Sequence, residues 1–165
     1  QGFRTVLKQE LGLEENDTYD TYDGMDLGLC RIDWNTGQIT FAGARHSLFY
    51  IKNGELDEIK GNRKSIGGRQ REEIRAFNNR QVDIPTGKDG EKELMIYMTT
   101  DGFADQHNAE NQKFGTRRLK EFLRDHAHLK VVEQQEALLK ALEAHQADEE
   151  QRDDITVIGI RLHPG

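Results

Sequence analysis

The first part of the chain carries short apolar runs separated by turn residues. The runs are short and bounded by turn residues, which predicts strands rather than helices. Asn-Thr-Gly at 35–37 and Asn-Gly at 53–54 have the composition of tight turns. We therefore expect a hairpin over residues 25–44 that continues as an antiparallel meander. The predicted strands are 25–33, 38–44, 47–51 and 55–59.

The middle of the chain predicts a loop, an extended segment and one strongly apolar strand. Residues 61–72 include three glycines and read as a loop. Residues 73–84 read as extended, Pro85–Gly90 as a turn, and residues 93–100 as a buried strand. In the extended segment the side chains expected to face inward are Ile74, Ala76, Val82 and Ile84.

Two helices follow. Over 115–126, Thr116 is placed to cap the helix, and Leu119, Phe122 and Leu123 form an apolar stripe at helical spacing. The second helix covers residues 129–146. Its expected apolar face consists of Val131, Leu138, Leu139 and Leu142.

The last segment, 154–162, is apolar at both odd and even positions, so it predicts a central strand covered on both faces. A run of strands, then helices, then a final strand predicts an α+β sandwich in one domain. Ahead of these elements, residues 1–11 show helical spacing, and residues 12–24 form a polar, acidic loop.

Composition narrows the classes of protein. The formal charge is −7 without any Lys/Arg block, which argues against nucleic-acid binding. Residues 60–75 are locally basic, and they read either as a solvated loop or as a patch that meets an anionic substrate. The single cysteine, Cys30, lies in an apolar run and excludes an internal disulfide. No signal peptide or apolar run of roughly 20 residues is present, so we expect a cytoplasmic location.

The chemistry-bearing residues lie at strand ends. Asp101 follows the strand 93–100 directly and precedes Gly102, while Asp153 and Asp154 precede the last strand. Taken alone, Asp-Gly is explained more simply by a plain turn. If the two strands are neighbours, however, Asp101 and Asp153 converge on one point. Oxygen-only ligands suit Mg²⁺ or Mn²⁺ rather than zinc, and no two histidines have the HxxxH spacing of a ligand pair.

Six segments occur along the chain in the order MDLGLCRID, TGQITFAGAR, SIGG, MTTDGFADQ, KFG and DDITVIGI. Together they resemble the stage II sporulation protein E-like branch of the metal-dependent (type 2C) protein serine/threonine phosphatases. The resemblance runs from about Tyr22 to Leu162. It implies an α-β-β-α sandwich of mainly antiparallel sheets flanked by helices, with two Mn²⁺ or Mg²⁺ ions in a cleft. It also implies hydrolysis of phosphoserine or phosphothreonine on a protein.

The resemblance assigns roles to particular residues. Asp101 and Asp153 correspond to metal ligands that act through a metal-activated water, and Asp154 to a supporting residue. Asp105 corresponds to a ligand of a weaker third ion or of a metal-bound water, and a plain surface acid is an equal alternative. The residues expected to shape the turn or the loop near the cleft are Thr100, Gly102, Gly67 and Gly68. His46 receives no role, and Asp23-Gly24 reads as a turn.

The amino-terminal motifs of the family are missing, including the Gly-Asp strand end that bridges both metals. We therefore interpret residues 1–165 as the C-terminal part of a single phosphatase domain, with 1–24 as a helix end and loop and 25–165 as the sandwich body. This piece alone is expected to be inactive and to expose an apolar sheet face that favours a homodimer.

In this branch the usual substrate is an anti-sigma-factor antagonist or a STAS-like protein in a partner-switching pathway. An upstream sensor or regulatory domain is expected for the parent protein, and an upstream region could anchor that protein to a membrane. The alternatives are a non-enzymatic phosphatase-like interaction module and a generic metal-binding α+β domain.

Overall fold

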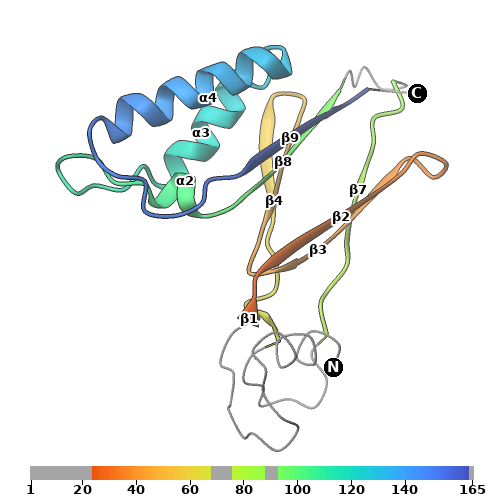
Figure 1. Ribbon diagram of the computed structural model, residues 1–165. Helices are drawn as coiled ribbons and strands as arrows, with labels where there is room; N and C mark the ends of the chain where they lie inside the picture. Colours follow the sequence, from red (N-terminus) through yellow and green to blue (C-terminus); the bar gives the residue numbers. More distant parts are fainter. Residues whose placement is uncertain (1–23, 68–75, 88–92, 164–165) are drawn as a thin grey trace, which may run out of the picture.

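A computed structural model describes residues 24–67, 76–87 and 93–163. The described residues form three antiparallel sheets, and the helices lie beside the four-stranded sheet (Figure 1). The sheet orders are β1–β6, β2–β3–β7 and β5–β4–β8–β9. The elements are β1 (Gly24–Met25), β2 (Leu27–Asp33), β3 (Gln38–Ala44), β4 (Leu48–Lys52), β5 (Glu55–Ile59), β6 (Ile66–Gly67), β7 (Arg80–Asp83), β8 (Leu94–Thr99), α2 (Gly102–Asp105), α3 (Thr116–His126), α4 (Val131–Gln146) and β9 (Val157–Leu162).

The predicted hairpin is present, but the predicted meander is wrong. β2 and β3 pair in antiparallel register from Leu27 opposite Ala44 to Asp33 opposite Gln38. β4 then leaves this sheet and pairs with β5 and β8 in the four-stranded one. The change of sheet is favourable because both faces of β4 become buried. In a meander, one face of this strand would remain exposed to solvent.

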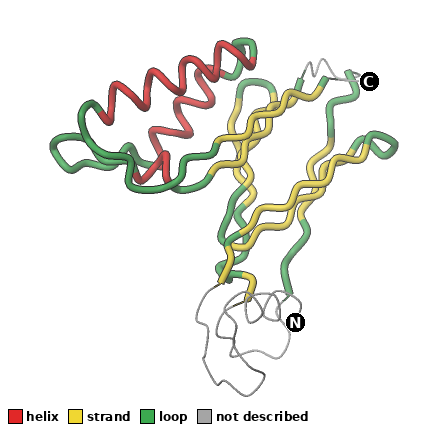
Figure 2. Tube along the Cα trace, in the orientation of Figure 1, coloured by secondary structure: helices red, strands yellow, loops and turns green. Residues whose placement is uncertain are grey.

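The two faces of the four-stranded sheet meet different partners. Toward the three-stranded sheet, Leu48 and Ile96 pack with Ile39 and Phe41 of β3. Toward the helices, Phe49 of β4 belongs to a cluster with residues of β8, α2 and α3. The described chain therefore has three layers, helix, sheet and sheet, as Figure 2 shows. An α+β fold with antiparallel sheets is confirmed.

Helix α3 confirms the predicted stripe but not the predicted cap. Leu119 and Leu123 are buried, and Phe122 stacks on His126 with ring centroids 3.9 Å apart. The N-cap is Gly115, with φ of 88°, and no side chain caps the helix. The residue before the helix has a positive φ, which glycine adopts easily and threonine does not. Gly115 therefore takes the cap position, and Thr116 is the first residue of the helix.

Helix α4 is less buried than its pattern predicts. Val131 and Leu139 are 46% and 54% exposed. The most buried side chain on the helix is Gln134, which accepts a hydrogen bond from the hydroxyl of Tyr97 at 2.6 Å. Burial raises the pKa of Tyr97 to about 12. The buried contact between α4 and β8 at Gln134 is therefore a polar one, whereas the expected face of the helix consisted of apolar residues.

Strand β9 was predicted to be central, and this is wrong for the described residues, where it is the edge strand beside β8. Its Ile158 is 46% exposed as a result. In the 73–84 segment Ile84 is buried and Val82 half-buried, whereas Ala76 is exposed because only 80–83 pair with β3. Ile74, Gly68 and the predictions for residues 1–23 lie outside the described residues.

Candidate active site

The ends of β8 and β9 are joined by a reciprocal set of hydrogen bonds. The hydroxyl of Thr100 donates to the carbonyl of Asp154 at 2.9 Å and accepts from the backbone N–H of Thr156 at 2.9 Å. The N–H of Thr100 also donates to the carbonyl of Thr156 at 3.0 Å. The segments that carry Asp101 and Asp153 therefore lie side by side. The metal-binding roles of the two carboxylates remain predictions.

Gly102 allows this close approach. A Cβ atom at this position would lie 2.5 Å from the carbonyl oxygen of Asp154 and 3.1 Å from Cγ1 of Ile155. The turn expected at Thr100 and Gly102 is in fact the start of α2. Glycine is therefore needed at this position because a side chain would not fit, rather than because of its backbone conformation. Asp101 is the N-cap residue, yet its side chain makes no capping hydrogen bond. Its carboxylate therefore remains open to another ligand.

Gln106 connects α2 to the loop before Asp153, and sequence reasoning missed it. Its side chain is buried, and Nε2 donates to the carbonyls of Glu150 at 3.1 Å and His107 at 3.2 Å. Its own carbonyl lies 3.1 Å from Nε2 of His145, which must donate because a carbonyl only accepts. A buried amide thus helps to place the segment that carries Asp153. Only the amide type and its position after the helix signalled this role.

A small cavity of about 260 Å³ opens beside Asp101. Of the predicted site residues, Thr100, Asp101 and Asp105 line it, whereas Asp153, Asp154, Gly102 and Gly67 do not. Gly67 pairs with Gly24 in the β1–β6 ladder and has φ of 77°. The polar lining residues that sequence reasoning did not select for the site are Asp26, Arg45, His46, Ser47, Glu58, Thr99 and Thr116.

Neighbouring groups contact three of the acids around this cavity, and two of these acids have a lysine as partner. Asp105 is paired with Lys113 at 2.9 Å, rather than left open as a third-ion ligand. Asp26 accepts a hydrogen bond from the hydroxyl of Ser65 at 2.5 Å. Burial opposes the ionisation of Glu58, but hydrogen bonds from Lys120, at 2.7 Å, and Ser47 hold the pKa of this carboxyl below its usual value. Asp101 makes no such contact among the described residues.

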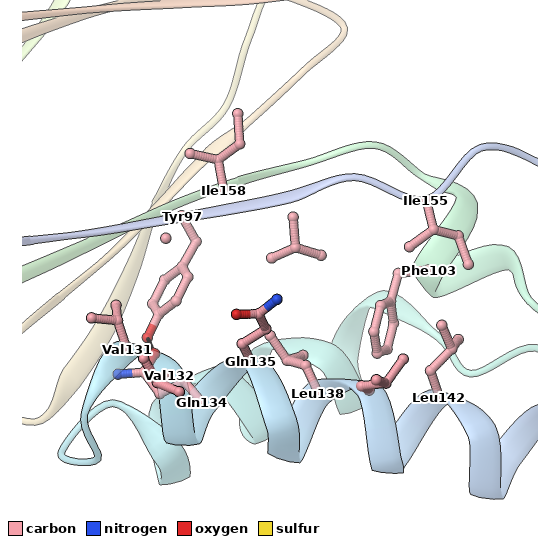
Figure 3. Close-up of a pocket in the computed structure, with 13 residues that line it drawn as sticks. Tyr97, Phe103, Val131, Val132, Gln134, Gln135, Leu138, Leu142, Ile155 and Ile158 are labelled. Carbon is pink, nitrogen blue, oxygen red and sulfur yellow. Dashed lines mark hydrogen bonds between the residues drawn. The ribbon is translucent and has the colours of Figure 1, made fainter.

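A larger, apolar hollow of about 610 Å³ lies between α4 and β9, and Figure 3 shows the side chains around it. Leu138 and Leu142 of α4 line it opposite Ile155 and Ile158, with Phe103 at its end. Tyr97 is its only titratable lining residue. The hollow therefore offers apolar contact and no acid–base or metal chemistry.

The donor type at the strand ends fits a hard divalent cation, since carboxylate and carbonyl oxygens are what Mg²⁺ and Mn²⁺ prefer. Within 24–67, 76–87 and 93–163, no cluster of three or more His, Cys, Asp or Glu side chains is arranged to hold a metal. The donor type at these strand ends thus suits part of a metal centre, and the roles of Asp101 and Asp153 in it remain predictions.

The comparisons with known proteins decide the family. A model of the stage II sporulation protein E (SpoIIE) family matches residues 9–163. The chain belongs to the SpoIIE family. The resemblance drawn from its motifs is confirmed, and the whole span from about Tyr22 to Leu162 lies inside the match.

Solved structures with the same fold are type 2C phosphatase domains. The SiaA domain of Pseudomonas aeruginosa is 37% identical, with a TM-score of 0.71 over 83% of this chain and 51% of that one. The SpoIIE phosphatase domain of Bacillus subtilis is 15% identical, with a TM-score of 0.57 over 96% and 64%. The phosphatase PstP/Ppp of Mycobacterium tuberculosis is 13% identical, with a TM-score of 0.59 over 99% and 67%.

The chain therefore spans about half of the SiaA domain and about two thirds of the others. No curated protein sequence matches it. Among the described residues, no helix is both long and apolar enough to cross a membrane.

Proposed function

We propose that this SpoIIE-family chain takes part in metal-dependent hydrolysis of phosphoserine or phosphothreonine on a protein. One observation carries the proposal. The Thr100–Asp154–Thr156 hydrogen bonds bring the Asp101 and Asp153 segments together at one edge of a type 2C fold. The substrate we favour is an anti-sigma-factor antagonist or a STAS-like protein in a bacterial partner-switching pathway.

In this proposal Asp101 and Asp153 would hold Mn²⁺ or Mg²⁺. When bound, such ions lower the pKa of a bound water and neutralise charge on the phosphoryl group. Thr100 fixes the two segments against each other, and Gly102 allows their contact. Asp154 contributes its backbone carbonyl to the same hydrogen bonds, which suits a supporting role. Asp105 would have to leave Lys113 to contact a third ion.

A covalent intermediate on cysteine does not suit the described chain. Cys30 is half-buried on β2, and burial raises the pKa of its thiol, which disfavours the nucleophilic thiolate. The cavity beside Asp101 is lined by acids and by Arg45, without a thiol. These features support direct attack by water on phosphorus.

The test is release of phosphate from a phosphoserine peptide by the full-length protein at saturating Mn²⁺. Asp101→Asn and Asp153→Asn are expected to abolish turnover and to weaken Mn²⁺ binding in calorimetry. Asp125→Asn is the matched control, because Asp125 is an exposed acid on α3 that pairs with Arg124. Turnover by either site variant within threefold of wild type would refute the assignment.

A non-enzymatic interaction module is the second candidate. It is favoured by the absence of a complete acidic cluster within the described segments. Such a module would bind the phosphorylated partner without releasing phosphate, whether or not Mn²⁺ is present. The same assay distinguishes the two, because bound but intact phosphopeptide indicates the module.

The remaining proposals concern the setting of the domain. The edge position of β9 and the exposed Ile158, Val132 and Leu139 support a homodimer or contact with a further protein segment. A cytoplasmic location and an upstream sensor or regulatory domain agree with a signalling phosphatase. Sedimentation of the full-length protein would test the dimer.

A further inference from the structure

The corner between β3 and β4 holds a side chain in an unusual backbone conformation. Arg45 has φ of 58°, in the left-handed region that favours glycine. A residue with a Cβ atom in this region costs about 1–2 kcal/mol relative to an ordinary conformation. Such strain persists only where the surrounding structure determines it, and it often marks functional sites. The question is what holds Arg45 there.

Two glycines and three hydrogen bonds hold the corner. A Cβ atom on Gly43 or on Gly61 would lie 2.2 Å from the carbonyl oxygen of His46. The N–H of Arg45 donates to the carbonyl of Asn62, and the N–H of Asn62 donates to the carbonyl of Gly43, each at 2.8 Å. Nδ1 of His46 lies 3.2 Å from the carbonyl of Thr99 and must donate to it. The corner is thereby tied to the end of β8, two residues before Asp101.

Arg45 lines the cavity beside Asp101. The two lysines near the cavity are already paired, Lys113 with Asp105 and Lys120 with Glu58. No carboxylate in the described part of the chain pairs with Arg45, which is exposed. Its positive charge is therefore available to an anion that enters the cavity.

We propose that Arg45 anchors the phosphate group of the substrate, and of the product phosphate, at this cavity. The inference rests on the proposed phosphatase function and adds the residue that recognises the phosphate. The guanidinium presents donors in a planar fork that matches two phosphate oxygens. His46 acts as a positioning residue, since its bond to Thr99 fixes the corner against the strand that carries Asp101.

The decisive variant is Arg45→Gly, which removes the guanidinium and also relieves the backbone strain. Loss of a charge-assisted pair is expected to raise the Kd for inorganic phosphate about 10- to 100-fold. The melting temperature is expected to stay equal or rise. Arg45→Lys keeps the charge without the planar fork and should give an intermediate Kd. Asn53→Gly is the matched control, since Asn53 has φ of 54° in the β4–β5 turn and does not line this cavity.

The assay is calorimetric titration of inorganic phosphate, and then of a phosphoserine peptide, into the full-length protein with Mg²⁺. Weaker binding by Arg45→Gly, with Asn53→Gly unchanged, supports the anchor. Binding by Arg45→Gly within twofold of wild type, or no phosphate binding by the wild type, overturns it. Hydrolysis is measured separately. Phosphate binding that depends on Arg45 without any hydrolysis would overturn the phosphatase and leave the anchor standing.

Discussion

The contact between Gly102 and Asp154 permits a sharp test of how the two acidic segments are held together. In Gly102→Ala, the new Cβ atom would lie 2.5 Å from a backbone carbonyl oxygen, where ordinary contacts begin at 3.4 Å. The nearest obstacles are the backbone carbonyl of Asp154 and Cγ1 of Ile155, and neither is the far end of a flexible side chain. Either the start of α2 or the segment before β9 must therefore move by roughly 1 Å.

The size of the effect follows from what this movement breaks. Overpacking of this kind costs about 1–3 kcal/mol. The bonds between Thr100 and the 154–156 segment are 2.9–3.0 Å long, and a shift of this size would weaken them, at about 1 kcal/mol each. We expect the free energy of unfolding to fall by about 2–3 kcal/mol, and the melting temperature by about 5–10 °C.

The assay combines thermal unfolding with Mn²⁺ titration and turnover of a phosphopeptide. Gly37→Ala is the control, because Gly37 has φ of 66° with nothing within 4 Å of its Cβ position. That variant should lose about 1 kcal/mol through backbone strain alone and keep its metal affinity and turnover. Gly102→Ala should lose stability, Mn²⁺ affinity and turnover together. If Gly102→Ala unfolds within 0.5 kcal/mol of wild type and retains turnover, the close approach has no role in the site.

Three further predictions test the surroundings of the site. Tyr97→Phe should unfold more easily by about 1 kcal/mol at neutral pH, because it loses the bond to Gln134. In the wild type the folded-state pKa of Tyr97, about 12, lies above its unfolded value of 10, so the free energy of unfolding should fall as the pH rises from 10 to 12. Urea titrations should show that this fall is absent in Tyr97→Phe. Gln106→Ala should cost about 1–3 kcal/mol in denaturant unfolding and reduce Mn²⁺ affinity, whereas unchanged affinity would separate Gln106 from the site. Folding lowers the pKa of Glu58, so this residue should stabilise the protein at pH values above its unfolded-state pKa. That stabilisation should be lost as the pH falls through the folded-state pKa. Glu58→Gln should therefore make the free energy of unfolding depend less on pH in the acid range.

The element types followed from local pattern. Short apolar runs separated by Asn-Thr-Gly and Asn-Gly turns predicted β2 to β5, and the i, i+3, i+4 stripe at Leu119, Phe122 and Leu123 predicted α3. These signals are local because turn geometry and helix periodicity depend on neighbouring residues. Asp101 and Asp153 were also chosen from sequence, because carboxylates at strand ends conflict with simple burial and matched a known family.

Other features depended on residues far apart in the chain. No local signal shows that β4 leaves the sheet of β3, that β9 lies at an edge, or that a lysine pairs with Asp105. The same holds for Arg45, whose role depends on Gly61 and Asn62 packing against the corner from another segment. Such contacts are chosen by the global burial of apolar faces and by steric fit.

The sequence by itself determined the family, the succession of strands and helices, and the two acidic strand ends. The tertiary structure alone decided that those ends meet, because the meeting depends on β8 pairing with β9 and on a glycine small enough to admit a carbonyl oxygen. Hydrophobic periodicity is a property of neighbours along the chain. A shared site is a property of distances between segments, and only packing sets those distances.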